Sequence, residues 1–419
     1  MAAITAIDAL LRKREIKKAE IQIARALNKP ATNGEYAALL TMRARAKLYT
    51  GRPEGALDDL MRAHEMASAL KNDPVWNELL ADSHLARYEL SAVGFAERAD
   101  AQHAEALYRD IASAFPTYEN LGWVNYQLAR VLLVTNRVPE AIESFQRALV
   151  TPSTVAALTS YCYERLGFVA FYEQRDAHQA LTFIEKAVQT YPASEDRGWL
   201  VQTYLLRGRI LRDTHKLKAA IQAAEAAISI ALAVKSESRQ TQREALFTAA
   251  EILSRARGTE QRVIEVIDQF FQRSRKPQTI DVTWSRAYEM LADAHAQLGK
   301  HEPAISAYLA SLQFNPYHPW EVSVYVKIAK SSYQLGDYER TIQAVRRALD
   351  VAKAETQPVD FQVYDLLGSA HYALGQYEKA VESFDDALRC APAADTALAK
   401  IRQYRAYAAS RLPRDPVIE

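Results

Sequence analysis

The sequence has few cysteines, no excess of charge of either sign and no long apolar run. Only Cys162 and Cys390 occur in 419 residues, which excludes a disulfide framework and a CxxC metal site. The 52 basic residues nearly match the 51 acidic ones, so the balance of charge does not steer the chain toward nucleic acid or a membrane surface. The most apolar long stretch, residues 219–234, contains Gln222 and Glu225 and cannot span a bilayer.

Signals for export and for catalysis are also missing. Asp8 interrupts the only apolar run near the N-terminus, and the basic residues follow that run, which is the reverse of a secretory signal. The sequence contains no GxxxxGK[ST], GxGxxG, HExxH or GxSxG motif, and it shows little strand-like alternation. We therefore expect a soluble, cytoplasmic protein that is not an enzyme and that holds no cofactor or metal.

Proline and glycine mark the ends of helical segments. Pro116, Pro192 and Pro392 each close a segment, because proline lacks an N–H and its ring clashes with the preceding turn. A set of glycines is placed in turns between paired helices: Gly51, Gly258, Gly299, Gly336 and Gly375. Three more glycines lie inside helices, at Gly167, Gly208 and Gly368. An interior glycine costs about 1 kcal/mol, so these positions predict the close approach of a neighbouring helix.

The spacing of these marks predicts about ten helix pairs and one final helix. The pairs are placed at 3–30, 36–71, 74–116, 120–152, 155–192, 196–235, 239–276, 281–316, 319–356 and 359–392, and the last helix at 394–411. The last pair contains LLGSAHYALGQYEKAVESFDDALRCAP, in which apolar and small residues recur at helical intervals on two segments. The same spacing recurs upstream with a period near 34 residues, which is typical of stacked helix pairs.

This pattern resembles the tetratricopeptide repeat family. It is carried by Leu367, Gly368, Tyr377, Ala380, Phe384, Ala387 and Pro392, and it is strongest in the last three pairs. The resemblance implies an all-α, right-handed superhelical solenoid in which residues 1–419 form one domain. In that domain, 3–30 is a degenerate first pair or cap, 36–392 holds the repeat pairs and 394–411 is a capping helix.

The resemblance also implies a non-catalytic scaffold or adaptor that binds a protein or peptide in a concave groove lined by the first helix of each pair. The residues expected to contact the partner are Arg45, Trp123, Tyr126, Arg130, Tyr161, Phe168, Tyr172, Arg209 and Arg212. Aromatic and arginine side chains are enriched at binding hot spots, so we hypothesise a peptide with acidic and apolar side chains. In the alternative interpretation, Phe168 and Phe171 pack between helices and the arginines pair locally with Glu164 or Asp213.

Other functions remain open at this stage. A regulatory accessory subunit of a larger complex and a peptide-sensing regulator are alternatives to a scaffold, and the open ends of a repeat stack allow a homo-oligomer. Nucleic acid is a less favoured partner, because acidic residues are interspersed on the same face: Glu78, Asp82, Glu164, Glu289 and Asp293.

Two groups of polar residues are interpreted as structural. His84, His295 and His371 occupy the same place in three aligned repeats, where we expect partly buried packing residues. Asp58 and Asp59 are consecutive, so their side chains point about 100° apart on a helix and cannot share a proton or metal. We expect both of these carboxylates to lie in solvent.

Overall fold

The computed structural model describes residues 2–28, 30, 32–90, 95–233, 239–392 and 397–412. These residues form α-helices and two short 3-10 helices, and none of the described residues lies in a β-strand. The all-α fold expected from the sequence is therefore confirmed. The chain divides into two compact units, Met1–Asp196 and Arg197–Glu419. Residues 29, 91–94, 234–235 and 394–396, which belong to the predicted pairs or the last helix, lie outside the described residues.

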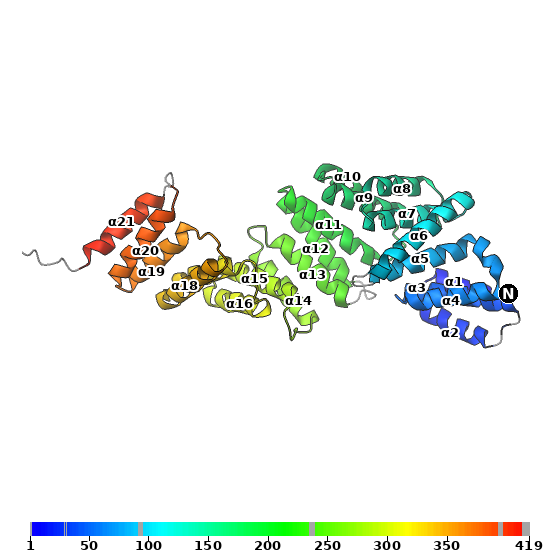
Figure 1. Cartoon of the computed structure of the whole chain (residues 1–419), viewed down its shortest axis with the longest axis horizontal. Coiled ribbons are helices and arrows are strands. Elements are labelled where there is room, and N and C mark those ends of the chain that lie inside the picture. The colour runs from blue at the N-terminus through cyan, green and yellow to red at the C-terminus, as the bar shows by residue number, and fades with distance from the viewer. Residues whose placement is uncertain are drawn as a thin grey trace, which may run out of the picture. The chain divides into compact units, whose positions relative to one another are not determined.

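The first unit contains five helix pairs (Figure 1). Its helices are α1 (Ala2–Arg12), α2 (Ile16–Leu27), α3 (Asn33–Tyr49), α4 (Pro53–Met66), α5 (Pro74–Leu90), α6 (Phe95–Ala114), α7 (Leu121–Val134), α8 (Val138–Val150), α9 (Leu158–Tyr172) and α10 (Ala177–Thr190), with a 3-10 helix η1 (Ser68–Asn72). The first helices α3, α5, α7 and α9 also contact one another in that order. We call the surface that these four helices share the first-helix face.

The second unit contains five further pairs and a last helix (Figure 1). They are η2 (Arg197–Trp199), α11 (Leu200–Asp213), α12 (Leu217–Ala233), α13 (Arg239–Leu253), α14 (Glu260–Arg273), α15 (Val282–Gln297), α16 (His301–Phe314), α17 (Glu321–Gln334), α18 (Tyr338–Ala354), α19 (Phe361–Ala373), α20 (Tyr377–Cys390) and α21 (Ala397–Ser410). The predicted number and order of the helix pairs are confirmed within the described residues. None of the described helices combines the length and apolar composition that a bilayer-spanning segment needs.

Small residues allow the two helices of a pair to pack closely. A Cβ atom added at Gly368 in α19 would lie 2.7 Å from ring atoms of Phe384 in α20, and one added at Gly167 would lie 2.7 Å from Ile184 Cδ1. The close approach predicted at the interior glycines is therefore confirmed. An alanine near the start of many second helices is fully or almost fully buried: Ala56, Ala141, Ala180, Ala220, Ala304 and Ala380. These contacts fix the register of each pair.

The turns between paired helices use the left-handed backbone conformation. Gly299, Gly336 and Gly375 have φ angles of 72°, 77° and 72°, a region that glycine enters at little cost. Asn136 and His215 adopt φ values of 60° and 59° in the corresponding turns of other pairs. The repeat of one turn geometry explains why the sequence period is visible even where the identities of the residues change.

The last helix covers the end of the second unit. Ile401 and Ala408 on α21 are almost completely buried and pack in one cluster with Phe361 and Phe384. Beside this cluster, Arg405 Nε donates a hydrogen bond to Asp385 Oδ1 on α20 at 2.9 Å, whereas Lys400 and Arg402 are exposed. The helix therefore has an apolar side toward the repeats and exposed charged residues on another side, as expected for a terminal cap.

Candidate binding site on the first unit

Two carboxylates on α5 form the centre of the site. Glu78 and Asp82 are four residues apart, so they lie on the same side of the helix, next to α7. Asp82 accepts hydrogen bonds from Tyr108 Oη at 2.6 Å, Gln127 Nε2 at 3.1 Å and Trp123 Nε1 at 3.5 Å. We call Glu78 and Asp82 the carboxylate pair.

Glu78 is held by two groups from the segment that leads into α7. Tyr118 Oη donates to Glu78 Oε2 at 2.9 Å, and Asn120 Nδ2 lies 3.0 Å from both carboxylate oxygens. The Asn120 side-chain oxygen in turn accepts hydrogen bonds from Ser153 Oγ at 2.9 Å and the Thr154 amide at 3.1 Å. The position of Glu78 is therefore tied to the loop that precedes α9.

The carboxylate pair lacks a cation in direct contact. No ion pair to Glu78 or Asp82 is found in the part of the chain that the structure describes, and Arg45 and Arg130 act on them only through longer-range attraction. Burial, followed by the neighbouring Asp82 charge, raises the pKa of Glu78 to about 8. Burial also raises the pKa of Asp82. Near neutral pH the pair therefore retains a proton that free carboxylates would have lost.

Aromatic side chains lie beside the carboxylate pair. Trp123 stacks on Tyr126 with ring centroids 5.3 Å apart, and Tyr126 also contacts Phe145 at 5.7 Å and Tyr161 at 6.1 Å. Tyr126 is only 7% exposed, so this predicted groove residue is part of the core and supports its neighbours from beneath. Trp123 and Tyr161 remain partly exposed on α7 and α9. These two residues offer the accessible aromatic surface near the pair.

A second aromatic group follows further along α9. Phe168 and Tyr172 are one turn apart, their ring centroids are separated by 4.6 Å, and both are partly exposed. Phe171 contacts Tyr172 edge-on at 4.9 Å. The guanidinium of Arg165 lies 5.7 Å from the Phe168 ring centroid. These contacts all lie within α9, and Phe168 still presents surface to solvent. The packing between helices that the alternative interpretation expected stays a prediction.

The four predicted arginines are all engaged within the chain. Arg45 pairs with Asp8 at 3.1 Å, and Arg130 pairs with Glu89 and donates to Gln127 Oε1 at 2.8 Å. In the second unit, Arg209 donates to Thr248 at 3.3 Å and Arg212 pairs with Asp213 at 2.6 Å. The alternative interpretation expected an arginine to pair locally with Asp213, and the structure shows this pairing for Arg212. Arg209 and Arg212 lie on α11 in a different unit from the other seven predicted residues.

The second unit contains an arrangement equivalent to the carboxylate pair. Glu289 and Asp293 on α15 stand in the sequence EMLADAH, which matches ELLADSH around Glu78 and Asp82. Here Lys327 Nζ lies 3.1 Å from Glu289 Oε1 and 2.9 Å from Asp293 Oδ1. Arg286 Nη1 lies 2.7 Å from Glu289 Oε2. Burial opposes ionisation of Glu289, but Lys327 and Arg286 outweigh it and lower its pKa.

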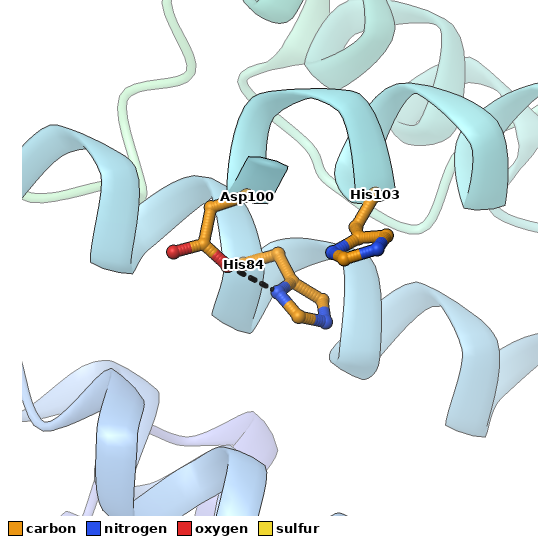
Figure 2. A group of neighbouring side chains, drawn as sticks. All are labelled: His84, Asp100 and His103. Carbon is orange, nitrogen blue, oxygen red and sulfur yellow. Dashed lines mark hydrogen bonds and ion pairs between the residues drawn. The ribbon is translucent and has the colours of Figure 1, made fainter. Parts of the chain in front are cut away.

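Three polar side chains converge between α5 and α6, as Figure 2 shows. His84 Nδ1 lies 2.6 Å from Asp100 Oδ1, and His84, Asp100 and His103 offer ligand atoms within 4.8 Å of one another. However, Arg87 donates from Nε to Asp100 Oδ2 at 2.7 Å and from Nη2 to Oδ1 at 2.5 Å. Because a guanidinium already holds both oxygens, and its charge repels a metal cation, the group serves as an ion-pair network between the two helices.

The histidines of the three aligned repeats are at least partly buried, as predicted. His371 is 3% exposed, and its Nδ1 lies 2.7 Å from Gln376 Oε1. Burial lowers the pKa of His84, His295 and His371, although Asp100 opposes the shift at His84 and Gln376 opposes it at His371. These residues are therefore mainly neutral packing groups near pH 7.

The expectation of a solvated Asp59 is wrong. Asp59 is 1% exposed on α4 and accepts hydrogen bonds from Arg43 Nε at 2.8 Å and Arg43 Nη2 at 2.6 Å. Lys47 Nζ lies 2.7 Å from the same carboxylate. Two cations one turn apart on α3 compensate the burial of this charge. Asp58, the adjacent residue, is exposed as expected.

Several residues of the site were not among those predicted from the sequence. They are the donors that hold the carboxylate pair: Tyr108, Tyr118, Asn120 and Gln127. The sequence signal that could have pointed to the carboxylate pair itself was the internal match between ELLADSH and EMLADAH, which places a glutamate four residues before an aspartate twice.

A separate hollow of about 450 Å³ lies between α6, α7 and α8, and its lining residues Arg109 and Glu140 pair with each other.

The fold and this surface define a class of protein, a helical repeat that presents side chains of successive helices on one face. Two family profiles, both described as Tetratricopeptide repeat, match the sequence, one at residues 320–393 and the other at residues 201–233 and 285–318. Residues 201–233, 285–318 and 320–393 are therefore tetratricopeptide repeats. The matches include the three last pairs, where the sequence predicted the strongest resemblance, and add the pair α11–α12.

Solved structures that match the chain share little sequence identity with it. The apo form of the quorum sensor NprR from B. thuringiensis is 14% identical, covers 75% of this chain and 86% of its own, and has a TM-score of 0.51. The C-terminal part of a TPR repeat-containing protein from Cytophaga hutchinsonii is 18% identical over 69% of this chain and 100% of its own, with a TM-score of 0.45. A search of curated proteins finds no significant match.

Proposed function

We propose that this protein is a non-catalytic scaffold or adaptor that binds a protein or peptide segment on the first-helix face of its first unit. The observation that carries the proposal is the row of partly exposed aromatic residues on α7 and α9, Trp123, Tyr161, Phe168 and Tyr172, next to a carboxylate pair without a cation. Rigid aromatic side chains supply contact area at a low cost in conformational entropy. Tetratricopeptide repeats are generally interaction modules, which agrees with this use of the surface.

The chemistry of the partner follows from what the surface leaves available. Apolar partner side chains can pack directly on Trp123 and Tyr161. Acidic side chains, the other part of the sequence-based hypothesis, would have to compete with Asp8 for Arg45 or with Glu89 for Arg130. We therefore propose apolar anchors as the main contribution to affinity.

The proposal is tested by selecting a random 12-residue peptide library on the purified full chain and measuring the affinity of the enriched peptides by fluorescence anisotropy. We expect Trp123→Ala and Tyr161→Ala each to weaken binding about tenfold, because each removes a partly buried aromatic contact. Trp320→Ala is the matched control, since Trp320 is 64% exposed in the second unit. Equal affinity of the wild type and both folded variants would contradict the proposal.

The purified chain and the selected peptides also distinguish a scaffold from the two alternatives, a peptide-sensing regulator and an accessory subunit of a larger complex. A peptide-sensing regulator should bind one short sequence strongly and change its hydrogen exchange over several repeats. An accessory subunit should instead bind a large protein in a fixed ratio, which light scattering after size exclusion measures together with any self-association. NprR is a quorum sensor with a similar fold, and a shared fold at this identity is compatible with each of these functions.

A further inference from the structure

Each unit contains an equivalent group of three side chains, which we call the cradle. In each, a first helix carries a glutamate and an aspartate four residues apart, and the second helix of the pair contributes a tyrosine. Tyr108 Oη donates to Asp82 Oδ1 at 2.6 Å in the first unit, and Tyr308 Oη donates to Asp293 Oδ1 at 2.6 Å in the second. Both tyrosines are buried, so Asp82 and Asp293 each accept a hydrogen bond from a buried hydroxyl group.

In the second unit this cradle holds an ammonium group. Lys327 Nζ on α17 contacts both carboxylates, at 3.1 Å from Glu289 Oε1 and 2.9 Å from Asp293 Oδ1. It also lies 5.7 Å from the centroid of the Tyr308 ring, within the range of a cation–π contact. The chain itself therefore shows which ligand chemistry the cradle accepts.

Among the described residues of the first unit, no cation contacts the carboxylate pair in this way. Alignment of α7 with α17 on their turn residues Asn136 and Gly336, both with positive φ, places Gln127 where the second unit has Lys327. Gln127 Nε2 donates one hydrogen bond to Asp82 at 3.1 Å and brings no charge. Alignment of ELLADSH with EMLADAH likewise places Val75 where the second unit has Arg286.

We infer that the carboxylate pair of the first unit binds a lysine side chain of the partner segment, as the second unit binds its own Lys327. The inference rests on the proposed function and names one contact within it. Glu78 and Asp82 are partly exposed, so an ammonium can reach both. The ring of Trp123, bonded through Nε1 to Asp82 Oδ2, lies beside the pair and can pack against the lysine methylenes.

The contact can be measured without knowledge of the natural partner. The full chain is labelled with ¹⁵N-tryptophan, and the indole signal of Trp123, one of five tryptophans, is assigned with Trp123→Phe. The probe is Nα-acetyl-lysine methylamide, and Nα-acetyl-norleucine methylamide is its uncharged analogue. We expect a saturable shift of the Trp123 indole with the lysine probe and an apparent affinity at least tenfold weaker with the norleucine probe.

Two kinds of variant identify the site. Gln127→Lys supplies the ammonium from within the chain, as Lys327 does, and should abolish the response to the probe. The Glu78→Gln and Asp82→Asn double variant should abolish it by removing the charges, and Glu289→Gln in the second unit should leave it unchanged. A response that persists in both first-unit variants, or that sodium chloride reproduces at equal ionic strength, overturns the inference, as does the absence of any saturable shift in the wild type.

The peptides selected in the earlier experiment separate this inference from the proposed function. Replacing their lysines by norleucine should weaken binding at least tenfold, and Gln127→Lys should weaken it similarly. Peptides that depend on Trp123 but bind equally well in both tests would overturn the lysine contact and leave the proposed binding face intact. If the lysine probe binds while no peptide depends on Trp123 or Tyr161, the proposed function fails and the lysine site stands.

Discussion

At the scale of single residues, the structure depends on positions that have no space for a larger side chain and on charged residues that have defined partners within the chain. Gly368 has no space for a side chain, because Phe384 occupies it. Gly34, near the start of α3, has only Thr32 Oγ1 at 3.9 Å from the same hypothetical atom. Gly368 therefore does not tolerate a larger side chain, whereas Gly34 does.

Gly368→Ala should destabilise the protein. The added methyl group overpacks the α19–α20 contact at a cost of about 1–3 kcal/mol, which exceeds the gain of about 1 kcal/mol in helix propensity. Gly34→Ala should be neutral or slightly stabilising. Urea denaturation followed by circular dichroism compares the two, and equal midpoints would contradict the packing argument.

Glu78→Gln should make stability less dependent on pH. The pKa of Glu78 is raised in the folded state to about 8, so the folded chain binds a proton that the unfolded chain has lost above about pH 4.3. Its contribution to stability is therefore lost as pH rises from about 4.3 to 8. The variant should melt higher than the wild type at pH 8.5, and this difference should shrink at pH 5.

Glu289→Gln is the control of opposite sign. The pKa of Glu289 is lowered in the folded state, so its ionised form stabilises the fold above its unfolded pKa and this contribution is lost as pH falls. This variant should melt lower than the wild type at neutral pH. Melting temperatures measured by differential scanning fluorimetry check both predictions. If the melting temperatures of the wild type and the two variants changed with pH in parallel, the opposite pKa shifts of Glu78 and Glu289 would be contradicted.

At the scale of elements, buried ion pairs join the two helices of a pair. Asp59 connects α4 to α3 through Arg43 and Lys47, and Asp100 connects α6 to α5 through Arg87 and His84. Each carboxylate lies on the second helix, while its cationic partners or histidine lie on the first. The same arrangement therefore fixes the register of two neighbouring pairs.

Asp59→Asn should lower the free energy of unfolding by about 2 kcal/mol, because it removes the charge that Arg43 and Lys47 contact. Asp58→Asn is the matched control, since Asp58 is adjacent and exposed, and a change within about 0.5 kcal/mol is expected. Chemical denaturation of the two variants distinguishes them. The interpretation would be wrong if Asp58→Asn cost as much as Asp59→Asn.

At the scale of the whole molecule, the helix pairs within each unit contact mainly their neighbours, so damage should remain local. The last helix shows this most clearly, because α21 packs on α20 and α19. Its buried residue Ile401 is 1% exposed, whereas Arg402 beside it is exposed.

Ile401→Asp should accelerate amide hydrogen exchange in α19, α20 and α21, because it places a charge in the apolar contact that closes the repeat array. Exchange in α3 and α4 should not change. Arg402→Asp should leave both regions close to the wild type. Hydrogen exchange with mass spectrometry resolves these regions, and a uniform increase along the chain after Ile401→Asp would argue against local coupling.

The sequence by itself determined the helix pairs, because their spacing, turn glycines and terminal prolines are local properties of the chain. It also indicated the small residues at which helices approach, such as Gly167 and Gly368. It did not determine which charged residues remain available. Arg45 pairs with Asp8 and Arg130 with Glu89, and these partners come from other helices, so only the tertiary structure could show them.

The carboxylate pair illustrates the same division. The sequence contains two nearly identical segments around Glu78 and Glu289, and nothing within them distinguishes one from the other. One difference lies on the same helix, where Val75 aligns with Arg286. The other lies in the helix that packs against each segment, where one unit places Gln127 and the other Lys327. Charge compensation depends on distances of a few ångströms between separate helices, and the folded structure decides those distances.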